Sequence, residues 1–153
     1  MLAAITGLAA RGTRMAVILT SVFGEVGERG RAEQSALLQA ARAGGLRLVG
    51  PNCMGVYSRP ASLNGTYFWE LPRLDGGIGV VSQSGAYGGL IMRHLGGAGL
   101  GVSRFLSIGN QVDLDIAEAL DYLATDEATR LVACFIEAVR DGRRFVEAAR
   151  RVT

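Results

Sequence analysis

Lysine is absent from this chain, and all 16 basic residues are arginines. The absence excludes a P-loop lysine, a Schiff-base lysine and a serine–lysine catalytic dyad within the chain. An anionic ligand must therefore be held by backbone amides, hydroxyl groups or guanidinium groups.

Cysteine and histidine are nearly absent as well. The chain has 2 cysteines, Cys53 and Cys134, and 1 histidine, His94. The cysteines form no C-x-x-C pair, and a zinc site built from this inventory would need carboxylates for most of its ligands. We expect no metal site in the chain. Two lone cysteines also fit a reducing, cytoplasmic setting.

Charge and hydropathy exclude further classes of protein. The net charge of +2 is too small to predict a nucleic-acid partner. No apolar run approaches the roughly 18 residues that a membrane-spanning helix needs, so no membrane partner is expected. The first apolar stretch has no basic residue before it, which argues against a signal peptide.

Glycines and aliphatic residues are abundant, and segments with the apolar pattern of a strand alternate along the chain with segments that have the pattern of a helix. The chain has 22 glycines and 49% hydrophobic residues, which is typical of a buried, turn-rich α/β core. Strands of a parallel sheet joined by helices of about a dozen residues are the expected architecture. The strands are predicted at 15–20, 46–50, 78–82, 102–109 and 130–138. The helices are predicted at 31–43, 84–96 and 113–124, with another from 141 onward.

Residues 58–76 interrupt this alternation. The stretch shows no sustained period and contains proline, an Asn-Gly pair and a cluster of aromatic residues. These features predict a connector without a regular element of its own.

Polar motifs follow several of the predicted strands. Because ligands of parallel α/β folds gather at the carboxyl ends of strands, we expect a binding site where these motifs meet. The motifs are GPNC at 50–53, SQSG at 82–85, SIGNQ at 107–111 and FIEA at 135–138.

Two interpretations of the SQSG motif remain open. The amides of a helix N-terminus carry about half a positive charge in sum, and the hydroxyls of Ser82 and Ser84 add donors for an anion. Gly85 would then let a phosphate or acyl phosphate approach the backbone. Alternatively, one of the two serines, Ser82 or Ser84, is an ordinary N-cap. A nucleophile elbow needs G-x-S-x-G, and Ser84 has Ser82 and Ala86 at the glycine positions, so serine hydrolase chemistry is not expected.

Other candidates also have two interpretations each. Cys53 follows Asn52 at the exit of a strand, where a thiol either meets a ligand or fills a small apolar gap. Glu137 ends an apolar strand, where a carboxylate is costly unless it is paired or functional. Its plain alternative is an ion pair with Arg140, Arg143 or Arg144.

The remaining polar residues have structural interpretations. Asp113 or Asp115 is expected to cap the following helix. His94 lies well inside a predicted helix and is expected to be structural or on the surface.

Taken together, the motifs resemble one family. The chain is similar to the NDP-forming acyl-CoA synthetases, which include the ADP-forming acetyl-CoA synthetases and the α subunit of succinyl-CoA synthetase. The resemblance extends from about Arg14 to Thr153. The strings that carry it are VILTSVFGEVGERG, RLVGPNCMGV, GGIGVVSQSGA, GVSRFLSIGNQVDLDIAEALDYLATD and FIEAVRDGRRF.

The resemblance implies a division of the chain and a reaction. Residues 1–57 match the second half of a Rossmann-like CoA-binding domain, 58–76 a connector, and 77–153 the first half of a flavodoxin-like ligase domain. The family interconverts acyl-CoA, NDP and phosphate with a carboxylate, CoA and NTP. The reaction passes through an acyl phosphate and a phosphohistidine.

The resemblance also implies roles for individual residues. Glu137 matches the carboxylate that steadies the phosphohistidine, and Asn52 and Cys53 match the segment beside the thiol end of CoA. The residues implied on the phosphate side are Ser82, Gln83, Ser84, Gly85, Gly109 and Asn110.

Several family features are not found in these residues. The Gly-rich turn that binds the CoA phosphates would precede Met1, the phosphohistidine would follow Thr153, and His94 does not match it. The ATP-grasp half, which handles ADP, ATP and Mg²⁺, has no counterpart here. We therefore expect the chain to need an ATP-grasp domain or β subunit, and not to complete the reaction alone.

Two other functions fit the same residues. One is a non-catalytic CoA-binding or regulatory module, as in the degenerate synthetase region of a protein lysine acetyltransferase. The other is a flavodoxin-like domain that binds a different phosphate ligand. In each case, exposed edge strands are expected to need a partner chain or a second copy of this one.

Overall fold

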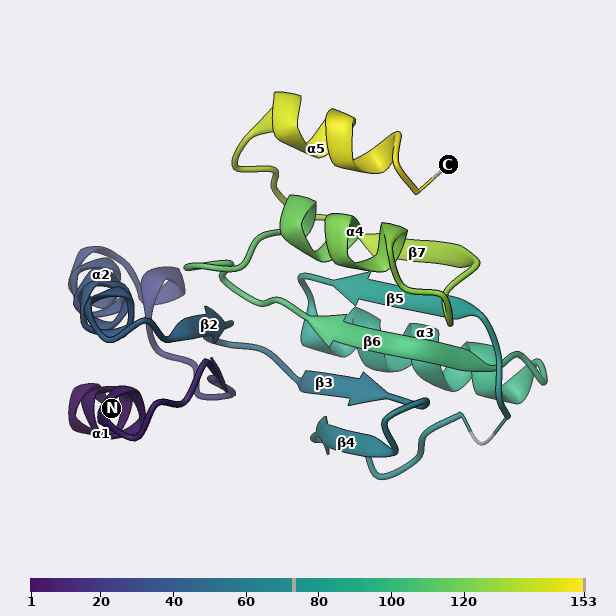
Figure 1. Ribbon diagram of the computed structural model, residues 1–153, viewed down its shortest axis with the longest axis horizontal. Helices are drawn as coiled ribbons and strands as arrows, with labels where there is room; N and C mark the ends of the chain where they lie inside the picture. Colours follow the sequence, from purple (N-terminus) through teal and green to yellow (C-terminus); the bar gives the residue numbers. More distant parts are fainter. Residues whose placement is uncertain (73, 153) are drawn as a thin grey trace.

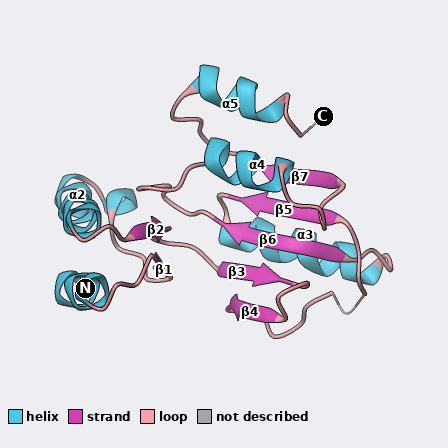
Figure 2. Cartoon of the chain, viewed as in Figure 1, coloured by secondary structure: helices cyan, strands magenta, loops and turns pink. Residues whose placement is uncertain are grey.

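The computed structural model describes residues 1–72 and 74–152, which form two α/β units side by side (Figure 1). The predicted boundaries include Arg73 and Thr153, which lie outside the described residues. Figure 2 distinguishes the helices and strands. The helices are α1 (Leu2–Ala10), a short 3₁₀ turn (Gly24–Val26), α2 (Glu28–Ala43), α3 (Gly85–Gly97), α4 (Ile116–Ala124) and α5 (Gly142–Ala149). The strands are β1 (Met15–Val17), β2 (Arg47–Val49), β3 (Gly55–Ser58), β4 (Leu63–Thr66), β5 (Ile78–Ser82), β6 (Val102–Ser107) and β7 (Leu131–Phe135).

The first unit is a two-stranded parallel sheet with two helices. β1 and β2 pair in parallel, and α2 provides the crossover that a parallel pair requires. The amphipathic pattern of α2 buries Leu37 and Ala41, which pack with Ile5 of α1 and Leu48 of β2.

The second unit is a five-stranded mixed sheet in the order β4-β3-β6-β5-β7. β6, β5 and β7 are parallel, as the sequence pattern predicts, but β3 is antiparallel to β6 and β4 is antiparallel to β3. The prediction that residues 58–76 hold no regular element is therefore wrong at β4. Most of β4 is exposed, so it has no apolar alternation from which a strand could be predicted.

Helices cover both faces of the second sheet, with α3 on one face and α4 on the other (Figure 1). Consecutive residues of β5 point to opposite faces, since Val80 packs with Met92 of α3, and Val81 packs with Leu120 of α4. α5 lies beyond α4 and packs against it through Ala148. Across residues 1–72 and 74–152, every helix is too short or too polar to cross a bilayer.

The two units are joined by the loop that follows β6. Its backbone amides at Asn110, Val112 and Leu114 donate to the carbonyls of Pro51, Gly50 and Leu48, at 2.9, 3.1 and 3.2 Å. The chain directions are opposite, so the loop runs along the end of β2 like an irregular antiparallel strand. This contact fixes the GPNC motif relative to the second sheet.

Candidate functional site

A pocket of about 410 Å³ brings together most of the predicted site. Its lining comes from segments that are far apart in the sequence, most of them at the carboxyl ends of parallel strands. The predicted residues that line it are Asn52, Cys53, Gln83, Ser84, Gly85 and Glu137. The other lining residues are Leu19, Ser21, Met54, Tyr67 and Ala86.

Ser84 is the N-cap of α3. Its hydroxyl oxygen accepts a hydrogen bond from the backbone amide of Tyr87 at 3.3 Å, which confirms the capping interpretation. The same residue lines the pocket, so the amino end of α3, with its unpaired amides, faces the pocket. These amides and the Ser84 hydroxyl are the donors that an anion would meet there.

Ser82 and Gly85 shape the turn in different ways. Ser82 is completely buried, and its hydroxyl donates to the carbonyl of Ser84 at 2.6 Å, so it stabilises the turn from the protein interior. The position that a Cβ on Gly85 would occupy is only 2.4 Å from Cγ of Met54. A larger residue at this position would therefore force the side chain of Met54 to move from the first turn of α3.

Gln83 is buried, and its side chain binds backbone beyond the end of β7. Its Oε1 accepts hydrogen bonds from the amides of Glu137 and Ala138, the latter at 2.8 Å, and its Nε2 donates to the carbonyl of Ala138 at 2.5 Å. The backbone amide of Gln83 also donates to the carbonyl of Phe135 at 3.1 Å. The SQSG turn and the segment that carries Glu137 are thus held together.

Glu137 is exposed and lies on the pocket rim. It does not end the strand as predicted, because β7 ends at Phe135. The plain alternative of an ion pair is wrong within the described residues, since the three nearby arginines bind elsewhere. Arg140 donates to the carbonyl of Gln111 at 2.6 Å, Arg143 pairs with Glu147 at 3.0 Å, and Arg144 pairs with Asp115 at 3.6 Å.

Cys53 lines the pocket but is only 4% exposed. Its thiol donates to the carbonyl of Ile18 at 3.4 Å, and burial raises the pKa of the thiol above its ordinary value. The sulfur is therefore protonated at neutral pH and is a poor nucleophile. This environment favours the gap-filling interpretation of Cys53.

Gly109 and Asn110 hold the pocket rim from outside the lining. A Cβ on Gly109, which has φ +50°, would lie 2.1 Å from the carbonyl oxygen of Pro51. Asn110 accepts a hydrogen bond from Nδ2 of Asn52 at 3.3 Å. Its own Nδ2 donates to Glu25 at 2.6 Å. Asn52 itself has φ +57°, so the two loops meet in strained, well-defined conformations.

Glu25 was not predicted as part of this region. Burial alone would raise the pKa of its carboxyl, but hydrogen bonds from Asn110 and from its own and neighbouring backbone amides lower the pKa overall. No local pattern signals such a residue, because its partner Asn110 is distant in the sequence. Leu19 and Ser21 were also missed. Ser21 directly follows the predicted strand at 15–20, so the same rule applied to it, whereas Leu19 was assigned to the strand itself, which ends earlier, at Val17.

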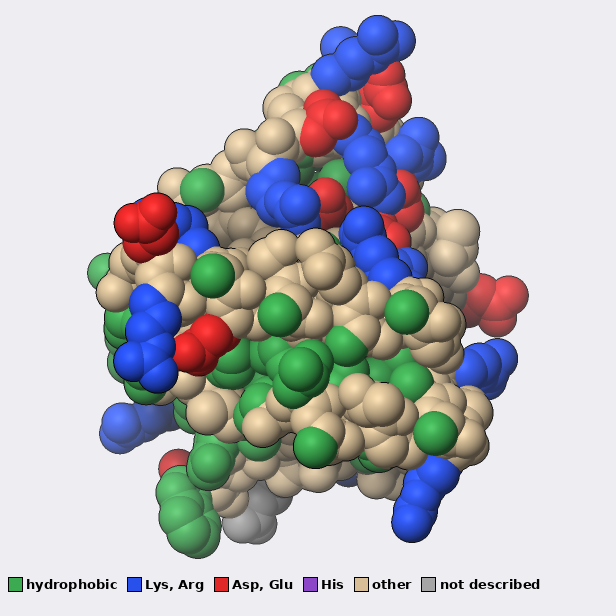
Figure 3. Space-filling view, turned by 90° about the vertical axis from the view of Figure 1, so that its left-hand side faces the viewer, with side chains coloured by type: hydrophobic (Ala, Val, Ile, Leu, Met, Phe, Trp, Pro, Cys, Tyr) green, Lys and Arg blue, Asp and Glu red, His purple; other side chains and the backbone are tan. Residues whose placement is uncertain are grey.

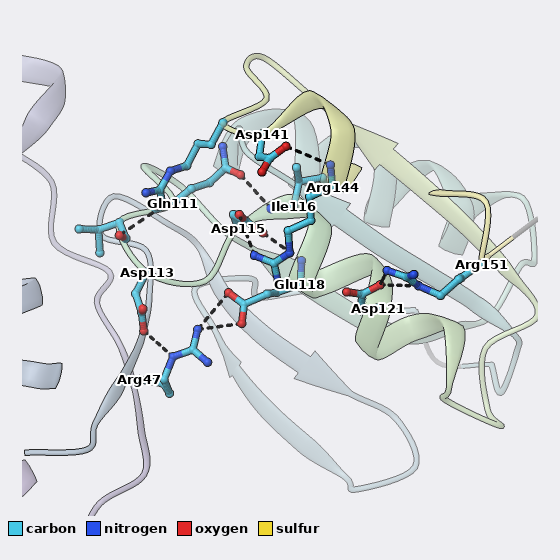
Figure 4. Close-up of polar contacts among 12 residues, drawn as sticks. Arg47, Gln111, Asp113, Asp115, Ile116, Glu118, Asp121, Asp141, Arg144 and Arg151 are labelled. Atoms are coloured by element: carbon cyan, nitrogen blue, oxygen red, sulfur yellow. Dashed lines mark hydrogen bonds and ion pairs between the residues drawn. The ribbon is translucent and has the colours of Figure 1, made fainter. Parts of the chain in front are cut away.

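A cluster of charged residues lies at the junction between the units (Figure 4). The side chain of Asp113 is 1% exposed and accepts from Arg47 at 2.7 Å, Arg42 at 3.2 Å and the Leu48 amide at 2.9 Å. Arg47 also binds Glu118 at 2.9 Å. Asp113 therefore joins the two units instead of capping a helix.

The two remaining structural predictions are confirmed. Asp115 is the N-cap of α4, and its carboxylate accepts from the amide of Glu118 at 3.0 Å. His94 is exposed in the last turn of α3.

The larger part of the second unit, from β5 onward, matches a known class of domain. The family model described as "Succinyl-CoA ligase like flavodoxin domain" matches residues 75–153. The chain is 40% identical over 143 residues to the "Acetate--CoA ligase [ADP-forming] II subunit alpha" of Pyrococcus furiosus, covering 94% of this chain and 31% of that one. The chain belongs to the NDP-forming acetyl-CoA synthetase family, and it spans about a third of the length of such α subunits.

Solved structures agree with this assignment. A crystal structure of a Pyrococcus horikoshii protein matches with a TM-score of 0.93 and 37% identity, covering 99% of this chain and 34% of that one. The dinucleotide-forming acetyl-coenzyme A synthetase 1 of Ca. Korarchaeum cryptofilum, in complex with phosphate and ADP, matches with a TM-score of 0.91 and 34% identity. That match covers 99% of this chain and 32% of the other. This chain therefore corresponds to a portion of an ADP-forming acyl-CoA synthetase.

Proposed function

We propose that this chain is the phosphate-handling portion of an ADP-forming acyl-CoA synthetase. The whole enzyme would interconvert acyl-CoA, ADP and phosphate with a carboxylate, CoA and ATP, through an acyl phosphate and a phosphohistidine. The observation that carries the proposal is that the amino end of α3, the GPNC loop and Glu137 all line the same pocket.

The residues in the pocket divide into roles. The Ser84 hydroxyl and the first amides of α3 would bind the phosphoryl group, because preorganised donors stabilise its charge without reorganisation. Asn52 and Cys53 would lie beside the thiol end of CoA. Gly109 and Asn110 would act through Asn52, which they hold in place.

Glu137 fits a partner that donates a hydrogen bond to its carboxylate. A carboxylate repels a phosphate dianion, but it accepts a hydrogen bond from the ring N–H of a neighbouring imidazole, including one that is phosphorylated on its other nitrogen. We propose that it faces the phosphohistidine of the complete enzyme. ADP and Mg²⁺ would be held by an ATP-grasp domain or β subunit that binds this chain.

Inorganic phosphate binding, measured by isothermal titration calorimetry on this chain, tests the proposal. We expect a dissociation constant on the order of 1 mM. Ser84→Asp keeps a good N-cap but adds a negative charge, and should weaken phosphate binding by at least about tenfold.

Ser84→Asn is the matched control, because asparagine has the same shape as aspartate, caps equally well and carries no charge. It should change phosphate affinity much less than Ser84→Asp. Equal phosphate affinity in both variants, or no binding by the unmodified chain, would contradict a phosphate site at the amino end of α3.

A further inference from the structure

The segment that carries Glu137 has no regular structure of its own. It follows β7, and its side chains are exposed, including Ile136 at 36% and Val139 at 38%. Few apolar contacts therefore fix its position. Its conformation must depend on polar contacts with the rest of the molecule.

Two buried glutamines make those contacts. Gln83 and Gln111 are 6% and 5% exposed, and both donate to the carbonyl of Ala138, at 2.5 and 3.3 Å. Gln83 alone also accepts from the amides of Glu137 and Ala138. Gln111 instead uses its Oε1 to accept from the amide of Ile116, at 2.9 Å (Figure 4).

Gln83 makes more contacts with the backbone of this segment than Gln111 does. Gln83 makes a paired donor and acceptor contact with one stretch of backbone, as a neighbouring strand would. It lies between Ser82 and Ser84, so it connects the anion-facing turn directly to Glu137. A buried amide with both ends engaged is costly to remove, because its backbone partners would be left unpaired.

We propose that Gln83 is a positioning residue that holds the carboxylate of Glu137 at the phosphate pocket. The inference rests on the proposed function and replaces direct phosphate binding as the main role of the Gln83 side chain. Because the side-chain amide of Gln83 fixes the position of Glu137, it determines how strongly the Glu137 carboxylate repels a bound anion. Gln111 contributes mainly to the fold of its own loop.

A double-mutant cycle, with inorganic phosphate as the probe, tests the proposal on this chain. In the unmodified background, Glu137→Gln removes a nearby like charge and should strengthen phosphate binding by about fivefold. In a Gln83→Met background, the same substitution should change affinity by less than about 1.5-fold, because Glu137 is no longer held at the pocket.

Gln111→Met is the matched control. It removes a glutamine of nearly equal burial, but one that makes no contact with the amide of Glu137. The effect of Glu137→Gln should be retained in this background. If it is also retained with Gln83→Met, Gln83 does not position Glu137, whatever its contribution to stability.

Amide hydrogen exchange on the unmodified chain keeps the test decisive if Gln83→Met does not fold. The amides of Glu137 and Ala138 should be protected although their segment is exposed, because both donate to Gln83. Fast exchange at both positions would overturn the proposal. Failure of the unmodified chain to bind phosphate would instead overturn the proposed function, and the exchange result would still stand.

Discussion

The backbone of Gly109 lies directly against the backbone of Pro51 and Asn52, and this contact shapes the rim of the phosphate pocket. Gly109 has φ +50°, and a Cβ there would lie 2.1 Å from one carbonyl oxygen and 2.4 Å from the next. Neither neighbour is a flexible side chain that can move aside. Both conformation and space therefore require glycine.

Gly109→Ala should accordingly lower the free energy of unfolding by about 1–3 kcal/mol. It should also weaken phosphate binding, because Asn52 lines the pocket. Urea denaturation and calorimetry provide the two measurements. Gly7→Ala is the control: Gly7 lies inside α1 with no atom near its Cβ position, so alanine should stabilise the chain by about 0.5–1 kcal/mol. A neutral Gly109→Ala would mean that the loops separate without cost.

At the level of elements, long periodic segments were predictable and short exposed ones were not. β5, α3, β6, α4 and β7 follow clear apolar periods, because each buries a face against its neighbours. β4 buries almost nothing and is held by pairing with β3, which leaves no pattern in its own residues. The antiparallel hairpin was therefore missed.

The site shows the same limit. The rule that ligands gather at the carboxyl ends of strands was enough to predict the motifs that meet in the pocket. It did not predict what each side chain does there. Gln83 binds backbone 54 and 55 residues away, and Asp113 binds residues 65 to 71 positions away. Such contacts depend on the final packing of the units and have no local signal.

At the scale of the whole molecule, one face carries a group of apolar side chains at its centre. Hydrophobic side chains gather in the middle of the face formed by α1 and α2 (Figure 3). Met1, Leu2 and Phe23 line a shallow pocket of about 230 Å³ there, and Leu2 is 49% exposed. Exposed apolar patches of this kind promote association.

We therefore expect the chain to self-associate as its concentration rises, and Leu2→Glu to shift it towards monomer. Sedimentation velocity over a range of concentrations measures this change. Val146→Glu is similar in exposure, at 45%, but lies on α5 in the other unit. Equal effects of the two substitutions would show that general hydrophobicity, and not this face, drives association.

The two units should unfold together, because Asp113 ties them. Burial alone would raise the pKa of its carboxyl, but hydrogen bonds from Arg47, the Leu48 amide and Arg42 lower the pKa overall below its ordinary value. A lowered folded-state pKa gives stability that is present above about pH 4 and is lost as the pH falls through the folded-state value.

Asp113→Asn should reduce the free energy of unfolding at pH 7 by about 1.5–3 kcal/mol, the contribution of a charged hydrogen bond. The difference from the unmodified chain should begin to shrink below about pH 4 and should disappear only as the pH falls through the lowered folded-state pKa, where the carboxyl becomes neutral in both states. Urea denaturation at each pH measures it. Asp75→Asn is the control, since Asp75 is 85% exposed in its pair with Arg59 and should contribute far less. A difference that persists at low pH would mean that the shape of the Asp113 side chain, and not its charge, joins the two units.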